Sequence, residues 1–183
     1  MKKDLQKYFI AFISIFFIAF TFNIEAQNQS SDREVKKTNI KYKKARALQA
    51  STAKKMAQVY EALEVVDDKG EPDPDMETVL SILNELRRDM ANLKSYDRSV
   101  MWNAWAFVYF SDGKYDQAMD AYYNLINEPE VTIGLRVGAL LSLAQLHLVQ
   151  ENYKEGIELI LQWMNEVEKV TAQSYSLLGQ AYY

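Results

Sequence analysis

The sequence contains no cysteine among its 183 residues and only one histidine, His147. The absence of cysteine excludes disulfide frameworks, thiolate zinc sites, iron–sulfur clusters and cysteine nucleophiles. It also excludes a lipid anchor of the bacterial lipoprotein type, which is attached to a cysteine. The lone histidine has no second histidine with which to form a metal site, so we interpret it as a packing residue of the fold.

Motifs for catalysis are missing as well. The sequence has no phosphate-binding glycine loop and no motif that indicates a nucleophilic serine with its base. One acidic cluster lacks the spaced ligands and the final glutamate of a calcium loop, so we interpret it as a solvated turn. This cluster consists of Asp67, Asp68, Glu71, Asp73 and Asp75. We therefore expect no enzymatic activity, no cofactor, no bound metal and no small-molecule substrate.

The first 26 residues have the pattern of an export signal. Lys2, Lys3 and Lys7 precede an apolar run over residues 8–22, and Ala26 is a suitable last residue before cleavage. The alternative is an uncleaved membrane anchor, although the run of about 15 residues is shorter than the roughly 20 that a spanning helix needs. We expect residues 1–26 to be removed after Ala26 and the mature protein to be soluble and periplasmic.

Positive charge is concentrated just after this signal, in a polar segment at 27–44 that shows no apolar periodicity and is expected to be flexible. The basic arm, residues 33–46, has one acidic residue, Glu34, and seven basic ones: Arg33, Lys36, Lys37, Lys41, Lys43, Lys44 and Arg46. The arm is either a solvated tail or a contact with an anionic surface such as a membrane. After residue 46 there are 21 acidic and 11 basic residues, which argues against nucleic acid as a partner.

The remainder of the chain has helical periodicity and no alternating strand pattern. Apolar residues at i, i+3, i+4 and i+7 predict one helix over 46–66 and a second over 74–93. These residues are Met56, Val59, Tyr60 and Leu63 in the first helix, and Met76, Val79, Leu80 and Leu83 in the second. Asp73 followed by Pro74 predicts the start of the second helix, as a cap residue and a first-turn proline. Residues 45–93 are thus expected to form a helical hairpin.

A longer pattern occurs three times along the chain. The three sets are Trp102, Trp105, Ala106 and Tyr109; Leu140, Leu143, Ala144 and His147; and Tyr175, Leu178, Gly179 and Tyr182. The interval from Trp102 to Leu140, which we call the repeat interval, separates the first two sets, and the third follows after a slightly shorter one.

Each of the first two sets is followed by a second, shorter set. Tyr115, Ala118 and Tyr122 follow the first, and Tyr153, Gly156 and Ile160 follow the second at the same spacing. The spacing predicts two hairpins, each made of a first helix, a turn and a second helix, with turns at 112–114 and 150–152. The third set predicts the first helix of a further repeat.

These residues resemble the pattern of tetratricopeptide repeats, which has a large residue, a small residue and a tyrosine on the first helix, glycine at the turn, and alanine and an aromatic residue on the second helix. The second repeat departs from that pattern at three positions, with Glu151 for glycine, Gly156 for alanine and His147 for tyrosine. The resemblance implies an all-α, right-handed superhelix of antiparallel hairpins. Residues 94–183 would be the repeats, and 45–93 a degenerate or capping repeat.

The first helix of the third repeat has apolar residues, but no second helix follows it in this sequence. We therefore expect the last repeat to be incomplete and the chain to be a fragment of a longer protein. Ligands of this family lie in a groove lined by the first helix of each repeat. By position, the groove residues here would be Asn103, Phe107, Phe110, Leu141, Gln145, Leu148, Ser176, Gln180 and Tyr183.

None of these predicted groove residues is charged, which argues against clamping of a peptide carboxylate and favours a segment that docks apolar side chains. Phe107 and Phe110 do not belong to the recurring sets, so they point to binding rather than packing. Residues 45–183 also resemble exported repeat proteins encoded beside TonB, ExbB and ExbD energy-transduction components of proteobacteria. We thus expect a periplasmic scaffold that binds an envelope protein. The alternative is the N-terminal module of a larger enzyme or envelope-assembly factor.

Overall fold

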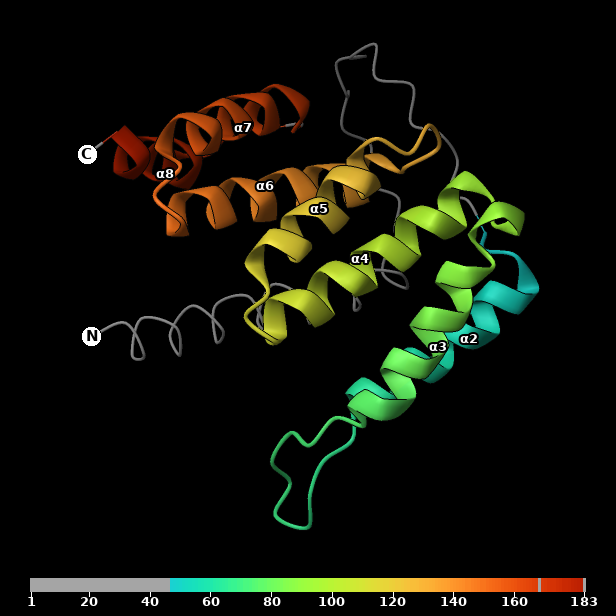
Figure 1. The fold of residues 1–183 in the computed structure, drawn as a ribbon. Coiled ribbons are helices and arrows are strands. Elements are labelled where there is room, and N and C mark those ends of the chain that lie inside the picture. The colour runs from blue at the N-terminus through green and yellow to red at the C-terminus, as the bar shows by residue number, and fades with distance from the viewer. Residues whose placement is uncertain (1–46, 168, 183) are drawn as a thin grey trace, which may run out of the picture. The chain divides into compact units, whose positions relative to one another are not determined.

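The computed structural model describes residues 47–167 and 169–182, without the side chain of residue 173, and the fold of this part is entirely α-helical (Figure 1). It contains seven α-helices and one short 3-10 helix, and no strand occurs in the described residues. The predicted all-α class is confirmed. No helix in the same residues has both the length and the apolar character that crossing a membrane requires. The predicted signal peptide, the basic arm and Tyr183 lie outside the described residues.

The first hairpin consists of α2, Ala50–Leu63, and α3, Met76–Arg88. Met56 and Val59 of α2 and Val79 and Leu83 of α3 are buried, as their spacing predicts. The other predicted core residues of these two helices are less covered, and Tyr60 and Leu80 are exposed at the edges of the two faces. The 3-10 helix η2, Met90–Asn92, then leads toward the next hairpin.

The start of α3 differs from the prediction. The helix begins at Met76, and its cap is Asp75 rather than Asp73. The Asp75 side chain accepts a hydrogen bond of 3.0 Å from the Thr78 backbone N–H, one of the donors that a helix N-terminus leaves unpaired. This hydrogen bond lowers the pKa of the Asp75 carboxyl group below its usual value. The predicted proline position therefore lies just outside the helix.

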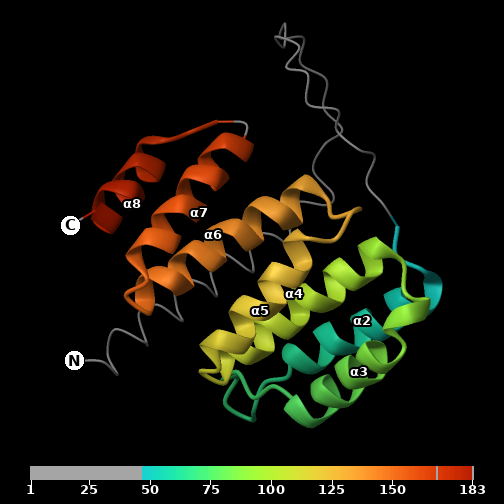
Figure 2. The same ribbon diagram turned by 45° about the horizontal axis from the view of Figure 1, so that its top comes forward.

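The two predicted repeats are present as hairpins with short turns. The first joins α4, Ser95–Ser111, to α5, Tyr115–Ile126, and the second joins α6, Ile133–Val149, to α7, Tyr153–Glu166. A last helix, α8, spans Ala172–Tyr182. Each helix contacts the next one along the chain, and α4 also contacts α6 (Figure 2). Such nearest-neighbour packing is typical of helical repeat proteins, in which one hairpin buries the apolar face of the next.

Both repeat turns close in the same way. In the first, the Lys114 N–H donates to the Tyr109 carbonyl and the Gly113 N–H donates to the Phe110 carbonyl. The second turn has the same two hydrogen bonds, each displaced by one repeat interval. This pattern requires a left-handed residue after the helix. Gly113 has a φ of 71°, and Glu151 has a φ of 64° although it is not glycine.

Small residues bring the paired helices together. Ala106 and Ala118 are fully buried between α4 and α5, and Ala144 is fully buried on α6. A Cβ atom added to Gly156 of α7 would lie 3.3 Å from the Ala144 carbonyl oxygen and 2.6 Å from Leu148 Cδ2. The second hairpin therefore needs glycine at a position where the first accommodates alanine.

Three of the recurring aromatic residues on α4 form one cluster beneath α3. The Arg87 guanidinium of α3 lies 5.6 Å from the ring centroid of Trp102 and 5.7 Å from that of Trp105. The rings of Trp105 and Tyr109 stack at 5.0 Å, and Arg87 Nη1 donates a hydrogen bond of 3.1 Å to the Tyr109 hydroxyl. These cation–π and stacking contacts join the first hairpin to the repeats. Trp102 and Trp105 belong to the core, and Tyr109 is half-buried against it.

Candidate interaction surface

Six of the predicted groove residues lie on two adjacent helices, and we call them the α4–α6 face. They are Asn103, Phe107 and Phe110 on α4, and Leu141, Gln145 and Leu148 on α6. Each is half-buried, and each α6 member follows its α4 counterpart by one repeat interval. Helix α4 contacts α6 directly, so the six residues occupy equivalent register positions on two neighbouring helices.

The α4–α6 face is uncharged and combines apolar side chains with two amides. The Phe110 ring lies 5.7 Å from that of Tyr115, at the start of α5, and Leu148 packs where a Gly156 side chain would otherwise lie. The Asn103 and Gln145 side chains make no hydrogen bond within the described residues. These amides are therefore free, within this part of the chain, to bond the backbone of a bound segment.

The other predicted groove residues are in a different environment. Ser176 and Gln180 lie on α8 and are exposed, and they are joined to each other by a hydrogen bond of 3.5 Å. Tyr183 lies outside the described residues. The described structure thus groups six of the nine predicted positions on α4 and α6 and places two more on α8.

Two hollows occur elsewhere on the described surface. One, of about 450 Å³, lies at the first repeat turn and is lined by Gly113, Lys114, Tyr115, Asp116, Gln117 and Gln150. The other, of about 170 Å³, is lined by Tyr123, Glu155, Glu158, Leu159 and Gln162. Neither is lined by a predicted groove residue. In the first, Gln150 Nε2 donates to Asp116 Oδ1 at 3.2 Å, which links the end of α6 to the start of α5.

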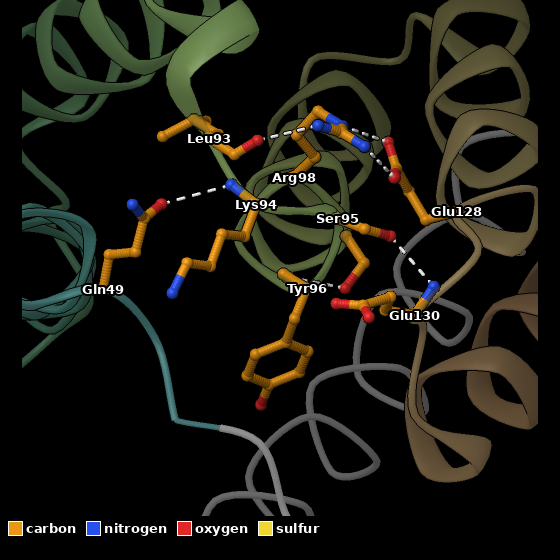
Figure 3. Close-up of polar contacts among 9 residues, drawn as sticks. Gln49, Leu93, Lys94, Ser95, Tyr96, Arg98, Glu128 and Glu130 are labelled. Carbon is orange, nitrogen blue, oxygen red and sulfur yellow. Dashed lines mark hydrogen bonds and ion pairs between the residues drawn. The ribbon is translucent and has the colours of Figure 1, made fainter.

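Arg98 and Arg136 each pair with a glutamate at the end of their own hairpin, and we call these two pairs the arginine clamps. The sequence analysis did not identify them. Arg98, in the first turn of α4, donates to both carboxylate oxygens of Glu128 at 2.7 and 2.8 Å, and to the Leu93 carbonyl at 2.7 Å (Figure 3). Bidentate pairs of this kind are among the stronger hydrogen-bonded interactions in proteins. The hydrogen bond with Glu128 raises the pKa of the Arg98 guanidinium.

The second clamp is the counterpart of the first in the next repeat. Arg136, in the first turn of α6, donates to both carboxylate oxygens of Glu166 at 2.7 and 3.0 Å, and to the carbonyl of Ile126. Each arginine therefore ties the start of one hairpin to the end of the same hairpin and to the segment before it. The two arginines are one repeat interval apart, and so are the two glutamates, which is the signal that would have identified these pairs in the sequence.

The start of α4 is also connected to the start of α2. The Gln49 N–H donates to Asp97 Oδ1 at 3.0 Å, and Gln49 Oε1 accepts from the Lys94 N–H at 3.1 Å. Asp97 is fully buried, and its Oδ2 atom has no hydrogen-bond partner in the described residues. Figure 3 also shows Ser95 Oγ accepting a hydrogen bond from the Glu130 N–H. This network fixes the end of α4 that lies next to the Arg98 clamp.

His147 is a buried residue at the junction of α5, α6 and α7. Its Nε2 atom lies 2.9 Å from the Tyr123 hydroxyl, and its buried Nδ1 atom has no partner in the described residues. Burial lowers the pKa of His147, and the nearby Glu155 carboxylate opposes that shift. The packing role predicted for His147 therefore agrees with its burial on α6.

Two further observations concern metal binding and similarity to known proteins. In the described ranges, no group of three or more histidine, aspartate or glutamate side chains is placed to hold a metal ion. No protein-family model matches the chain, and no curated protein matches it in sequence.

Proposed function

We propose that this protein is an exported, non-enzymatic tetratricopeptide-repeat scaffold that binds a protein partner in the periplasm through the α4–α6 face. One observation carries the proposal. Two successive repeats present uncharged, half-buried residues at the same register positions on contacting helices. In a repeat protein, such equivalent positions add up to one extended binding surface.

The chemistry of the α4–α6 face favours a segment with apolar side chains. Phe107, Phe110, Leu141 and Leu148 offer partly exposed apolar area, and burying that area on binding is favourable. Asn103 and Gln145 would bond the backbone of the segment, which fixes its register. A charged peptide terminus is disfavoured, because no basic side chain belongs to this face.

The partner we propose is a component of a TonB-type energy-transduction system. This choice rests on the resemblance of residues 45–183 to exported proteins encoded beside TonB, ExbB and ExbD. Co-purification of each component with the tagged protein, from cells that contain all three, tests the assignment. Recovery of none of them with the wild-type protein would refute it and would leave the binding proposal to the next experiment.

Site-specific photo-crosslinking tests the α4–α6 face itself. A photoreactive residue at Gln145 should capture a partner in intact cells, whereas the same residue at exposed Gln58 of α2 should not. Adding Phe107→Ala and Phe110→Ala should reduce the yield by about tenfold or more, because truncating interface aromatics commonly weakens binding by over about 1 kcal/mol each. Unchanged capture by a variant with a wild-type circular dichroism spectrum would rule this face out.

A further inference from the structure

Arg87 of α3 is held in place by residues of α4, although part of its guanidinium group is unused. The guanidinium lies over the rings of Trp102 and Trp105, and its Nη1 atom donates to the Tyr109 hydroxyl at 3.1 Å. The residue is nevertheless exposed, and its Nε and Nη2 atoms have no hydrogen-bond partner in the described residues. These two nitrogens form one edge of the planar group, which we call the Nε–Nη2 edge, and their donors have a fixed fork geometry.

The arginine clamps show which group binds such an edge in this protein. In each clamp, the arginine Nη1 atom donates to a backbone carbonyl. The Nε and Nη2 atoms of the same arginine donate to the two oxygens of one glutamate carboxylate. Arg87 has its Nη1 atom anchored in the same way, with the Tyr109 hydroxyl in place of the carbonyl. Its Nε–Nη2 edge therefore has the donor arrangement that holds a carboxylate in both clamps.

The acidic residues that flank Arg87 along the chain are engaged elsewhere. Glu85 Oε1 accepts a hydrogen bond of 2.7 Å from Lys55 Nζ, and Asp89 Oδ1 accepts one from Asn92 Nδ2. No ion pair joins Arg87 to a carboxylate within the part of the chain that the structure describes. A carboxylate at the Nε–Nη2 edge would therefore come from outside the described residues.

We propose that Arg87, positioned by Tyr109, is a binding site for a carboxylate group of a protein partner. The carboxylate accepts one hydrogen bond from Nε and one from Nη2, which is the bidentate geometry of the two clamps. Binding requires little further ordering of the side chain, because the rings and the Tyr109 hydroxyl already hold the guanidinium. The site lies on α3 and includes no residue of the α4–α6 face, so the proposal does not depend on the proposed function.

NMR of the arginine Nε–H groups in the isotope-labelled chain tests the site directly. The probe is N-acetylglutamic acid α-amide, which has only a side-chain carboxylate, added at constant ionic strength. Arg87 should bind it with a dissociation constant about fivefold lower than Arg88, because the Arg88 side chain must be ordered on binding. Arg88 is the matched control, since it is also exposed and its side chain has no partner in the described residues. Equal responses of the two arginines would overturn the proposal.

The clamps serve as internal controls, and two further probes identify the ligand. The Arg98 and Arg136 signals should not respond, because glutamates already occupy their Nε–Nη2 edges. N-acetylalanine has only a terminal carboxylate, so the tighter binder of the two carboxylate probes shows whether a side chain or a chain end is preferred. Binding of either one supports the site. Binding of neither, or of inorganic phosphate alone, would refute it.

A tyrosine variant tests the positioning role of Tyr109. Tyr109→Phe keeps the ring that stacks on Trp105 but removes the oxygen that anchors Arg87 Nη1. It should weaken binding of the tighter carboxylate probe by about threefold, which corresponds to the loss of one hydrogen bond. Tyr153→Phe, which removes an exposed hydroxyl on α7, should leave the affinity unchanged. Wild-type affinity in a Tyr109→Phe protein with a wild-type circular dichroism spectrum would contradict the role assigned to Tyr109.

Discussion

The hairpins α4–α5 and α6–α7 have the same arrangement of helices, but they differ at the left-handed residue of the turn and at the closest contact between their helices. The first has Gly113 in the left-handed position of its turn and Ala118 at the helix contact. The second has Glu151 in the left-handed position and Gly156 at the contact. The turn of the second hairpin is therefore strained, and its helices approach where no side chain fits. Each hairpin is also held by its own arginine clamp.

The largest expected effect comes from filling the close contact in the second hairpin. Gly156→Leu should destabilise the protein by about 3 kcal/mol, because the added atoms overlap Leu148 and the Ala144 carbonyl. Urea unfolding followed by circular dichroism measures the change. Gly138→Leu is the matched control on α6, where the space beside the glycine is open, and it should cause no loss. Equal losses would show that the close approach at Gly156 is not limiting.

The two clamps allow the hairpins to be compared directly. Arg98→Ala and Arg136→Ala should each destabilise the protein by about 2 kcal/mol, because a carboxylate loses its bidentate partner. The loss should be larger for Arg98, since the Glu128 side chain is 11% exposed and that of Glu166 is 22% exposed. Double-mutant cycles with Glu128→Ala and Glu166→Ala measure the coupling. A larger coupling for Arg136 would contradict the ranking by exposure.

Equivalent positions hold Tyr109 in the first hairpin and His147 in the second. At this position, only the second hairpin should lose stability in mild acid. Burial lowers the pKa of His147, so the unfolded chain takes up a proton at higher pH than the folded chain does. The stability that neutral His147 contributes is therefore present above the unfolded pKa of about 6.5 and is lost as pH falls below it.

Urea unfolding between pH 7 and pH 5 measures this loss, with His147→Gln as the comparison. The variant keeps a neutral group beside Tyr123 and should show a shallower fall in stability, by less than about 1.4 kcal/mol per pH unit for one titrating group. Identical pH profiles for the two proteins would show that His147 does not titrate differently on folding.

The smallest effect concerns the two turns. Glu151→Gly should stabilise the protein by about 1 kcal/mol, because it removes a left-handed non-glycine residue. Gly113→Ala should destabilise it by a similar amount, about 1 kcal/mol, because it places a Cβ atom in the same conformation. Thermal unfolding should record opposite shifts of a few degrees. Shifts of the same sign would contradict the equivalence of the turns.

Much of the repeat region could be predicted because its signals are local. The repeat interval placed both turns correctly, and it identified buried residues such as Leu140 and Ala144. The start of α3 was predicted too early, because Asp73 and Asp75 are both suitable caps and only the hydrogen bond to Thr78 distinguishes them. The half-buried positions of the α4–α6 face follow from the same register, and their binding role stays a prediction.

The sequence by itself determined the all-α class, the repeat period and the residues that form the recurring core, because helical periodicity is encoded within a few turns of chain. Only the tertiary structure decided which distant groups pair, including Arg98 with Glu128, Arg87 with the tryptophans, and Gln49 with Asp97. It also showed that Tyr175 and Tyr182 of α8 are exposed, whereas Leu140 and His147 at the equivalent positions of α6 are buried. The reason is physical: burial and ion pairing depend on which segments meet in space, and the spacing of residues along one helix does not specify its neighbour.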